Sequence, residues 1–423
     1  MKKIQLHIEA LSPLAIGKKK AGAITTTEDY IHGSVIRGAI AANLLKESGH
    51  SHQDLTQDGG DFQALFLGDR PAIFHNAYPA TIQNNRRTLI QDEVKVLPAT
   101  ALSSKTNPGF LKKSEKRSLK KEGGIFDTLI DRFCSDRYGQ PYDPISPTDE
   151  GRVDSPGITF YSKLHGKYYS HSVNKRLLTR VGINRRRATA EEQILYSIEV
   201  LNESEGRGEK PRPVSYSGSI LVPENNLAEQ LTQFINARQT NFRLGGSLSR
   251  GLGKVKMVAK LVDINSQIES RVTNFNEKLN QRWQEWSETF DAIQSDWNSD
   301  RIFFTIDLQS DAILNEDWRR TTVISERMLQ DFSEIEDSSL KLHVAYSSYD
   351  YCSGWNAAWG RMKDMELVTN KGAVYLFSTN QKELWLQSLA ELENKGIGER
   401  TLEGFGQIQV CNEFHLELWD NPV

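Results

Sequence analysis

Polar and apolar residues follow regular patterns from the beginning of the chain. Ile4, Leu6 and Ile8 alternate with polar residues, which predicts a strand with one buried face. After a loop through 17–27, the segment IHGSVIRGAIAANLLKES has apolar residues at helical spacing, and Ser34 is placed to cap the helix N-terminus. The chain is therefore expected to open with a strand followed by a helix.

Similar patterns continue through the first half and recur in the second. In the first half the predicted elements are a strand, a helix, a glycine-rich loop and a strand, at 213–222, 224–237, 244–253 and from Val255 onward. In the second half they are a strand, a helix, two strands, a helix and a glycine-rich loop, at 301–309, 326–335, 341–347, 372–378, 382–395 and 396–406. Both halves begin with a strand and end with helix, glycine-rich loop and strand. This order predicts an α+β fold with an internal duplication.

Two segments lie outside these series. Residues 99–157 contain five prolines and the basic run LKKSEKRSLKKEGG, which predicts a long irregular insertion. The segment 264–300 is polar, and its Trp283 and Trp286 have the spacing of a buried helix face, so it predicts a helical connector. The expected arrangement is a first domain, a connector and a second domain, at 1–263, 264–300 and 301–423.

The charge of the chain is divided unevenly between the halves. The 423 residues have a formal net charge of −3, which by itself does not favour a nucleic-acid partner. However, residues 1–260 hold 38 Lys and Arg against 27 Asp and Glu, whereas residues 261–423 hold 14 against 28. The first half therefore suits a polyanion, and the second half suits a protein partner or a solvated surface.

Several classes of protein are excluded by missing motifs. The three cysteines are far apart, which argues against a disulfide framework or zinc knuckle and for a reducing compartment. The N-terminal residues alternate instead of forming a signal-peptide core, and no apolar run is long enough for a membrane span. There is no GxxxxGK[ST] or HExxH motif, and both glycine-rich loops precede a strand, unlike a Rossmann fingerprint. We expect a cytoplasmic protein without a resident cofactor.

Three segments have residues suited to phosphate or RNA. Gly33 and Ser34 place free amides at a helix start, and glycines in 244–253 let backbone amides approach an anion closely. Residues 161–190 combine cations with rings and lack acidic residues, as a groove for single-stranded nucleic acid does. The cations are Lys163, Lys167, Lys175, Arg176, Arg180, Arg185, Arg186 and Arg187, and the rings are Tyr161, His165, Tyr168, Tyr169 and His171. A plain helix cap and a solvated surface hairpin remain alternatives.

These motifs resemble those of the CRISPR-associated RAMP superfamily. GGSLSRGLGKVKM resembles its glycine-rich loop, and IHGSVIRGAI resembles its N-terminal segment, with His32 where proline is typical. NKRLLTRVGINRRRATAEEQILYSIEVL resembles its arginine-rich thumb hairpin, at about 161–201. SGWNAAWG, GAVYLF and GIGERTLEGFGQIQV resemble a second RAMP unit. This order of motifs is similar to that of the RAMP subunit of type III-D effector complexes, which is related to the group-five subunits.

The resemblance implies tandem ferredoxin-like (RRM-like) domains that hold the repeat-derived 5′ tag of a guide RNA (crRNA). It implies target RNA, other RAMP subunits and the large polymerase/cyclase-like subunit as further partners, and no membrane. The RNA-binding residues that it implies lie at the helix start, in the thumb and in the first glycine-rich loop: Ser34, Arg37, Lys175, Arg176, Arg180, Arg185, Arg186, Arg187, Ser247, Ser249, Arg250, Gly251 and Lys254.

Two other functions remain open. In an endoribonuclease, Asp29 would stand where backbone-type RAMP subunits carry a cleaving aspartate, and it could hold Mg²⁺, the only cofactor considered. The alternative for Asp29 is a turn-stabilising residue. Metal-free processing of guide precursor would need a histidine, and His165 and His171 lie in the thumb region. The other function is a protein scaffold that makes no RNA contact.

Overall fold

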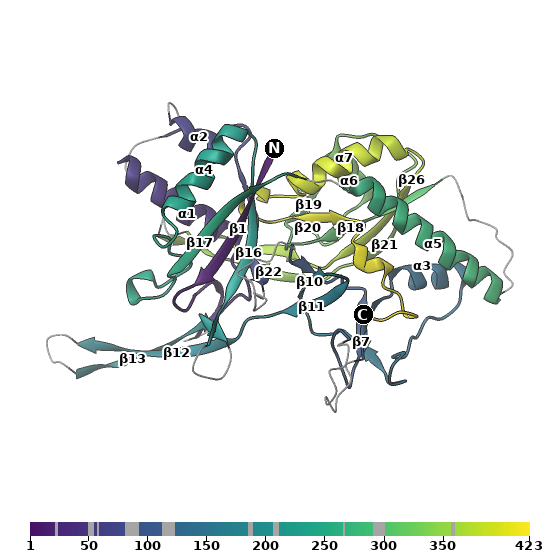
Figure 1. Ribbon diagram of the computed structural model, residues 1–423, viewed down its shortest axis with the longest axis horizontal. Helices are drawn as coiled ribbons and strands as arrows, with labels where there is room; N and C mark the ends of the chain where they lie inside the picture. The colour runs from purple at the N-terminus through teal and green to yellow at the C-terminus, as the bar shows by residue number, and fades with distance from the viewer. Residues whose placement is uncertain are drawn as a thin grey trace.

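The computed structural model describes residues 1–21, 24–49, 55–56, 59–80, 93–111, 123–184, 189–205, 211–264, 267–290, 301–356 and 360–423. Two sheets with their helices lie side by side, the N-terminal one on the left of Figure 1 and the C-terminal one on the right. A two-stranded hairpin projects from the N-terminal part. None of the helices in these ranges is long and apolar enough to cross a bilayer.

The first sheet is antiparallel and carries its helices on one face. Its spatial order is β17 (Val255–Val262), β1 (Lys2–Ala10), β16 (Ser215–Val222) and β4 (Ile73–Phe74), and β5 (Tyr78–Ala80) also pairs with β16. Ile4, Leu6 and Ile8 are fully buried in one core with α1 (Gly33–Ser48) and α4 (Asn225–Ala237). The alternation seen in the sequence thus marks the helix-covered face, and the predicted strands and helices are confirmed.

The second sheet is also antiparallel and is covered on both faces. Its spatial order is β21 (Lys341–Tyr346), β26 (Val374–Thr379), β18 (Ile302–Leu308) and β27 (Ile408–Val410). Phe304 stacks on Trp385 of α7 (Lys382–Lys395), which lies beside α6 (Glu326–Ser333). Phe303, on the opposite face, contacts Phe133 of α3 (Leu129–Tyr138), which packs on α5 (Ile268–Phe290). The predicted connector is therefore helical over 268–290 and covers this sheet.

The two sheets share one strand order. In each, the strands lie in the order fourth, first, third, second along the chain, if β4 and β5 are counted together as the second strand. In each, a helix follows the first strand and another follows the third. The antiparallel sheets and their helices confirm the α+β class.

The projecting hairpin is the most extended feature of the chain (Figure 1). It consists of β12 (Lys175–Asn184) and β13 (Thr189–Leu201), and β13 also pairs in parallel with β3 (Ile24–Thr27), which pairs with β2 (Gly17–Ala21). Residues 160–171 do not belong to it. They form β10 (Phe160–Leu164) and β11 (Lys167–His171) in a separate sheet with β6 (Lys95–Val96). The projecting hairpin is therefore shorter than the range of 161–201 expected for a thumb.

The segment 99–157 is more regular than its prolines suggest. It forms a sheet of β7 (Ala101–Ser104), β8 (Ile125–Asp127) and β9 (Val153–Asp154). The helix α3 lies between β8 and β9 in the chain. Leu129, Ile130 and Phe133 of α3 are buried in the same core as the second sheet. The expectation of an irregular insertion is wrong for β7, β8 and α3, because their apolar side chains pack on other parts of the chain: α3 packs on the second half, and Ile125 of β8 packs with Leu97 and Tyr161.

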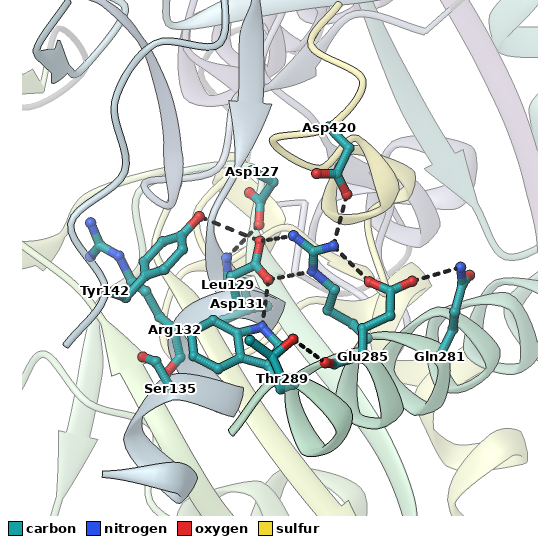
Figure 2. Close-up of polar contacts among 12 residues, drawn as sticks. Asp127, Leu129, Asp131, Arg132, Ser135, Tyr142, Gln281, Glu285, Thr289 and Asp420 are labelled. Atoms are coloured by element: carbon teal, nitrogen blue, oxygen red, sulfur yellow. Dashed lines mark hydrogen bonds and ion pairs between the residues drawn. The ribbon is translucent and has the colours of Figure 1, made fainter. Parts of the chain in front are cut away.

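A charged network ties α3 to the connector helix and to the C-terminal residues (Figure 2). The carboxylate of Asp131, which is fully buried, accepts hydrogen bonds from Arg282 at 2.6 and 3.3 Å and from Trp286 at 3.1 Å. Arg282 also contacts Glu285 and Asp420, each at 2.7 Å. Burial opposes the charge of Arg282, but Asp131 and its other partners raise the pKa of the guanidinium. The network therefore fixes three segments that are distant in sequence.

The remaining elements are short. They are α2 (Gly60–Phe66), β14 (Ser204–Glu205), β15 (Arg212–Pro213), β19 (Leu314–Glu316), β20 (Arg319–Thr321), β22 (Tyr349–Cys352), β23 (Trp355–Asn356), β24 (Arg361–Met362), β25 (Glu366–Thr369) and the 3-10 turns η1 (Leu248–Arg250), η2 (Thr401–Glu403) and η3 (Glu413–Leu416).

Candidate nucleic-acid interface

The first glycine-rich loop has a backbone that only glycine adopts easily at several positions. Gly245 and Gly253 have φ values of 87° and 83°, and a side chain at Gly245 would collide with the carbonyl of Ala15. Ser247 also lies in the left-handed region and precedes the turn η1. Ser249 and Arg250 within η1, and Gly251 directly after it, are exposed. The loop is thus a fixed projection with an accessible tip.

This loop meets the projecting hairpin through a cation and a ring. The guanidinium carbon of Arg250 lies 4.9 Å from the centroid of the Tyr196 ring on β13. Tyr196 is the register partner of Arg180 on β12, and Arg180 is exposed. Two arginines and one ring that are distant in sequence therefore share a surface, which is an arrangement suited to phosphates and unpaired bases.

Tyr196 was not identified from the sequence as a candidate RNA-binding residue, because in the sequence it is only one of the alternating residues of a strand. The signal that could have found it is its position opposite Arg180 in a hairpin, but that register was not fixed by the pattern alone. Lys254 is exposed at the end of the same loop, and its backbone amide donates to Ser12 Oγ at 2.8 Å. Lys254 thus lies beside the loop.

Two other predicted RNA contacts at the base of the hairpin have carboxylate partners. Lys175 Nζ lies 2.5 Å from Asp29 Oδ1 and 2.9 Å from the carbonyl oxygen of Thr27. Arg176 donates to both oxygens of Glu203, at 2.7 and 3.1 Å. The lack of acidic residues within 161–190 was therefore misleading, because distant segments supply them. Arg185, Arg186 and Arg187 lie outside the described residues.

Three of the five rings predicted to stack on bases are packed within the chain, whereas His165 and Tyr169 are exposed. Tyr161 and His171 are only 3% and 5% exposed. Tyr168 packs on Phe110 and donates a 2.5 Å hydrogen bond to Glu417, and burial together with this carboxylate raises the pKa of Tyr168. His171 Nε2 contacts Ser162 Oγ at 2.8 Å, and burial lowers the pKa of His171 to about 4. The prediction of a stacking groove over these three rings is wrong, since they form the packing of a small sheet.

The start of α1 is covered rather than open. The helix begins at Gly33 after His32, so Ser34 lies inside the first turn and is not the N-cap. The amide of Gly33 donates to Asn76 Oδ1 at 2.8 Å, and a side chain at Gly33 would lie 2.7 Å from the carbonyl oxygen of Glu403. The anion site expected here is therefore closed by Phe74 and Asn76 of the first half and by Glu403 of the second half.

Arg37 is also engaged within the protein. Its Nη2 donates to the carbonyl oxygen of Phe66 at 2.9 Å, and its guanidinium lies 5.4 Å from the centroid of the Phe66 ring. These contacts join α1 to the end of α2. The predicted role of Arg37 at an open helix N-terminus does not fit this position.

The second glycine-rich loop repeats the backbone of the first. Ile397 donates to Gly406 as Leu244 does to Gly253, and Glu399 donates to Ile313 as Gly246 does to Ala15. Corresponding residues of the two loops are thus 153 positions apart, and Glu403 stands where the first loop has Arg250. The carboxylate of Glu403 is held by Arg400 at 2.6 Å and by Lys363 at 3.0 Å.

The backbone of the second loop packs on the first half of the chain. A side chain at Gly404 would lie 2.7 Å from Asn76 Oδ1 and 2.9 Å from the carbonyl oxygen of Phe74. At Gly251, the corresponding position, nothing lies within 4 Å of such a side chain. These contacts give the second loop a packing role, whereas the tip of the first loop is open.

The candidate nuclease residue lies at the base of the hairpin. Asp29 is paired with Lys175, and its neighbour Glu28 is largely buried, with Lys18 Nζ 3.7 Å away. Burial raises the pKa of Glu28 despite this cation. Within the described ranges, His, Cys, Asp and Glu form no group of three or more that could hold a metal ion.

Comparisons with known proteins place the chain in a family. Among solved structures, a chain of "Type III-B Cmr-beta bound to cognate target RNA and AMPPnP, state 1" is 12% identical, with a TM-score of 0.36, covering 88% of this chain and 86% of the other. A chain of the complex "bound to cognate target RNA" is 13% identical, with a TM-score of 0.29, covering 61% and 96%. No curated protein sequence matches. The family model of the RAMP superfamily matches residues 7–256, more than half of the chain, and the chain belongs to that superfamily.

Proposed function

We propose that this chain is a guide-RNA-binding subunit of a type III CRISPR effector complex, and that it has no catalytic role of its own. The observation that carries the proposal is the contact between Arg250 and Tyr196, with Arg180 beside it. Membership of the RAMP superfamily and the order of motifs along the chain support the assignment. We further propose the type III-D class and the repeat-derived 5′ tag as the bound segment.

The electrostatics of the surface support RNA as the ligand. Arg180, Arg250 and Lys254 are exposed on the hairpin and the loop, and Ser249 and Gly251 lie beside them. Guanidinium and ammonium groups can follow phosphates, while an arginine plane and a tyrosine ring can stack on an unpaired base. Ser247 contributes by fixing the left-handed start of the loop tip.

The two halves fit a duplicated ferredoxin-like unit, which we propose as tandem RAMP domains at 1–263 and 301–423. The shared strand order and the matching hydrogen bonds of the two loops support this division. In the proposed arrangement, the first domain binds crRNA and its target RNA. The second domain contacts other RAMP subunits and the large polymerase/cyclase-like subunit.

The test is RNA binding by the purified full chain. Fluorescence anisotropy with repeat-tag RNA should show roughly tenfold weaker binding for Arg250→Ala, which corresponds to about 1.4 kcal/mol. Arg180→Ala should weaken binding and reduce the salt dependence by about one counterion. Lys382→Ala removes an exposed cation on α7 and serves as the charge-matched control. Unchanged affinity in both arginine variants would contradict the proposal.

A further inference from the structure

The hairpin β19–β20 carries a tryptophan at its tip that is almost fully in water. Glu316 pairs with Arg319, so Asp317 and Trp318 form a two-residue connection between the strands. The Trp318 side chain is 97% exposed. A side chain of this size gains nothing from packing at that position, so the fold itself does not explain it.

The backbone at this tip is also unfavourable for tryptophan. Asp317 and Trp318 have φ values of 47° and 64°, and both thus lie in the left-handed region. A two-residue hairpin of this kind favours Asn-Gly or a similar pair, because a bulky side chain there is strained. Strain at an exposed position indicates a requirement outside the folding of the chain.

The base of this hairpin is held firmly. Arg320 contacts Glu366 at 2.7 Å and Glu399 at 2.6 Å, which ties β20 to β25 and to the second glycine-rich loop. Ser325 donates to Glu316, and Arg327 lies 3.2 Å from Asp317. The indole is therefore presented on a rigid support, which lowers the entropy lost when it binds.

The charges around the tip distinguish between two kinds of partner. Three arginines near the tip, Arg319, Arg320 and Arg327, are matched in number by three carboxylates, Asp317, Glu366 and Glu399, so the tip has no excess of positive charge. The half of the chain from residue 261 onward has 14 cations against 28 acidic residues. A nucleic acid would need excess positive charge here, whereas a protein pocket can take an indole without it.

We propose that Trp318 is an anchor that inserts into an apolar pocket on another protein subunit of the complex. This inference rests on the proposed function, since it takes the partner to be a subunit of the same assembly. Tryptophan is among the residues that dominate binding energy at protein interfaces. The position is distinct from the Arg250 surface, which lies on the first half of the chain.

The test uses three full-length chains and the remaining subunits assembled with guide RNA. Trp318→Asn removes the indole and suits the left-handed backbone, so the free variant should melt at a higher temperature than the wild type. Its affinity for the remaining assembly should fall at least tenfold, while its affinity for guide RNA alone should not change. Trp318→Phe keeps an aromatic ring and should bind with intermediate affinity.

Quenching of tryptophan fluorescence distinguishes a protein partner from an RNA partner. The difference between wild type and Trp318→Phe reports the indole at 318, which should become protected from acrylamide when the remaining assembly is added. Protection by guide RNA alone would overturn the proposal in favour of base stacking. Equal affinity of Trp318→Asn and wild type for the assembly, or a lower melting temperature of Trp318→Asn, would also overturn it. Wild-type chain that binds neither guide RNA nor the assembly would contradict the proposed function as well.

Discussion

His415 forms the most deeply buried ionic cluster of the chain among the described residues, and replacing it should change how stability depends on pH. The imidazole is fully buried, with Nε2 2.7 Å from Asp307 Oδ1 and Nδ1 3.1 Å from Asp127 Oδ1. The Asp307 contact has hydrogen-bond geometry, and the Asp127 contact is an ion pair only. The cluster joins η3 to β18 and β8.

The expected magnitude follows from the charge of the imidazole. Burial disfavours the charged form, but Asp307 and Asp127 together raise the pKa of His415 from 6.5 to about 10. A shift of this size corresponds to about 5 kcal/mol of folding free energy. Because the folded-state pKa is the higher one, this contribution is fully present below pH 6.5 and is lost as pH rises towards 10. His415→Asn removes the cation from two buried carboxylates, which costs about 3–5 kcal/mol near neutral pH.

Urea unfolding, followed by tryptophan fluorescence at pH 6.5, 8 and 9.5, measures how the contribution of His415 to the unfolding free energy depends on pH. The difference in unfolding free energy between wild type and His415→Asn should shrink by about 1.4 kcal/mol per pH unit over this range. His165→Asn changes an exposed histidine and is the matched control. A difference that stays constant with pH would refute the reasoning, because it would mean that His415 is neutral in the folded protein.

Three further outcomes are expected. Arg282→Ala leaves the buried carboxylate of Asp131 without its cation and should lower the unfolding free energy by about 3 kcal/mol in urea titrations; an unchanged midpoint would contradict the role of the network. Gly404→Ala should lower the melting temperature more than Gly251→Ala, since both positions have positive φ but only Gly404 faces neighbouring atoms; equal shifts would show that the loop contact is unimportant. Asp29→Asn should leave cleavage of target RNA with Mg²⁺ by the assembled complex unchanged, and loss of the product would establish the nuclease alternative.

The fold could be predicted largely from local pattern. Alternation and helical spacing reflect which face of an element is buried. This can be recognised from a few neighbouring residues, as in β1 and α4. The candidate site was less predictable because charge pairing is not local. Lys175 and Arg176 have no acidic residue near them in the sequence. In the structure, however, Asp29 and Glu203 balance their charges. The closure of the α1 start likewise depends on residues that are distant in sequence, namely Phe74, Asn76 and Glu403.

The opposite net charges of the two halves are also found at one pair of equivalent positions, 250 and 403, in the two glycine-rich loops. The first loop has Arg250 on an open tip, and the second loop has Glu403 at the corresponding position, where Arg400 and Lys363 hold it within the chain. The same backbone therefore presents a cation outward in one half and uses a carboxylate for internal packing in the other. Since the scaffold is shared, this side-chain difference can decide which loop is free to meet a polyanion. A charge reversal at 250 should consequently abolish RNA binding without unfolding the loop, whose glycines keep its shape.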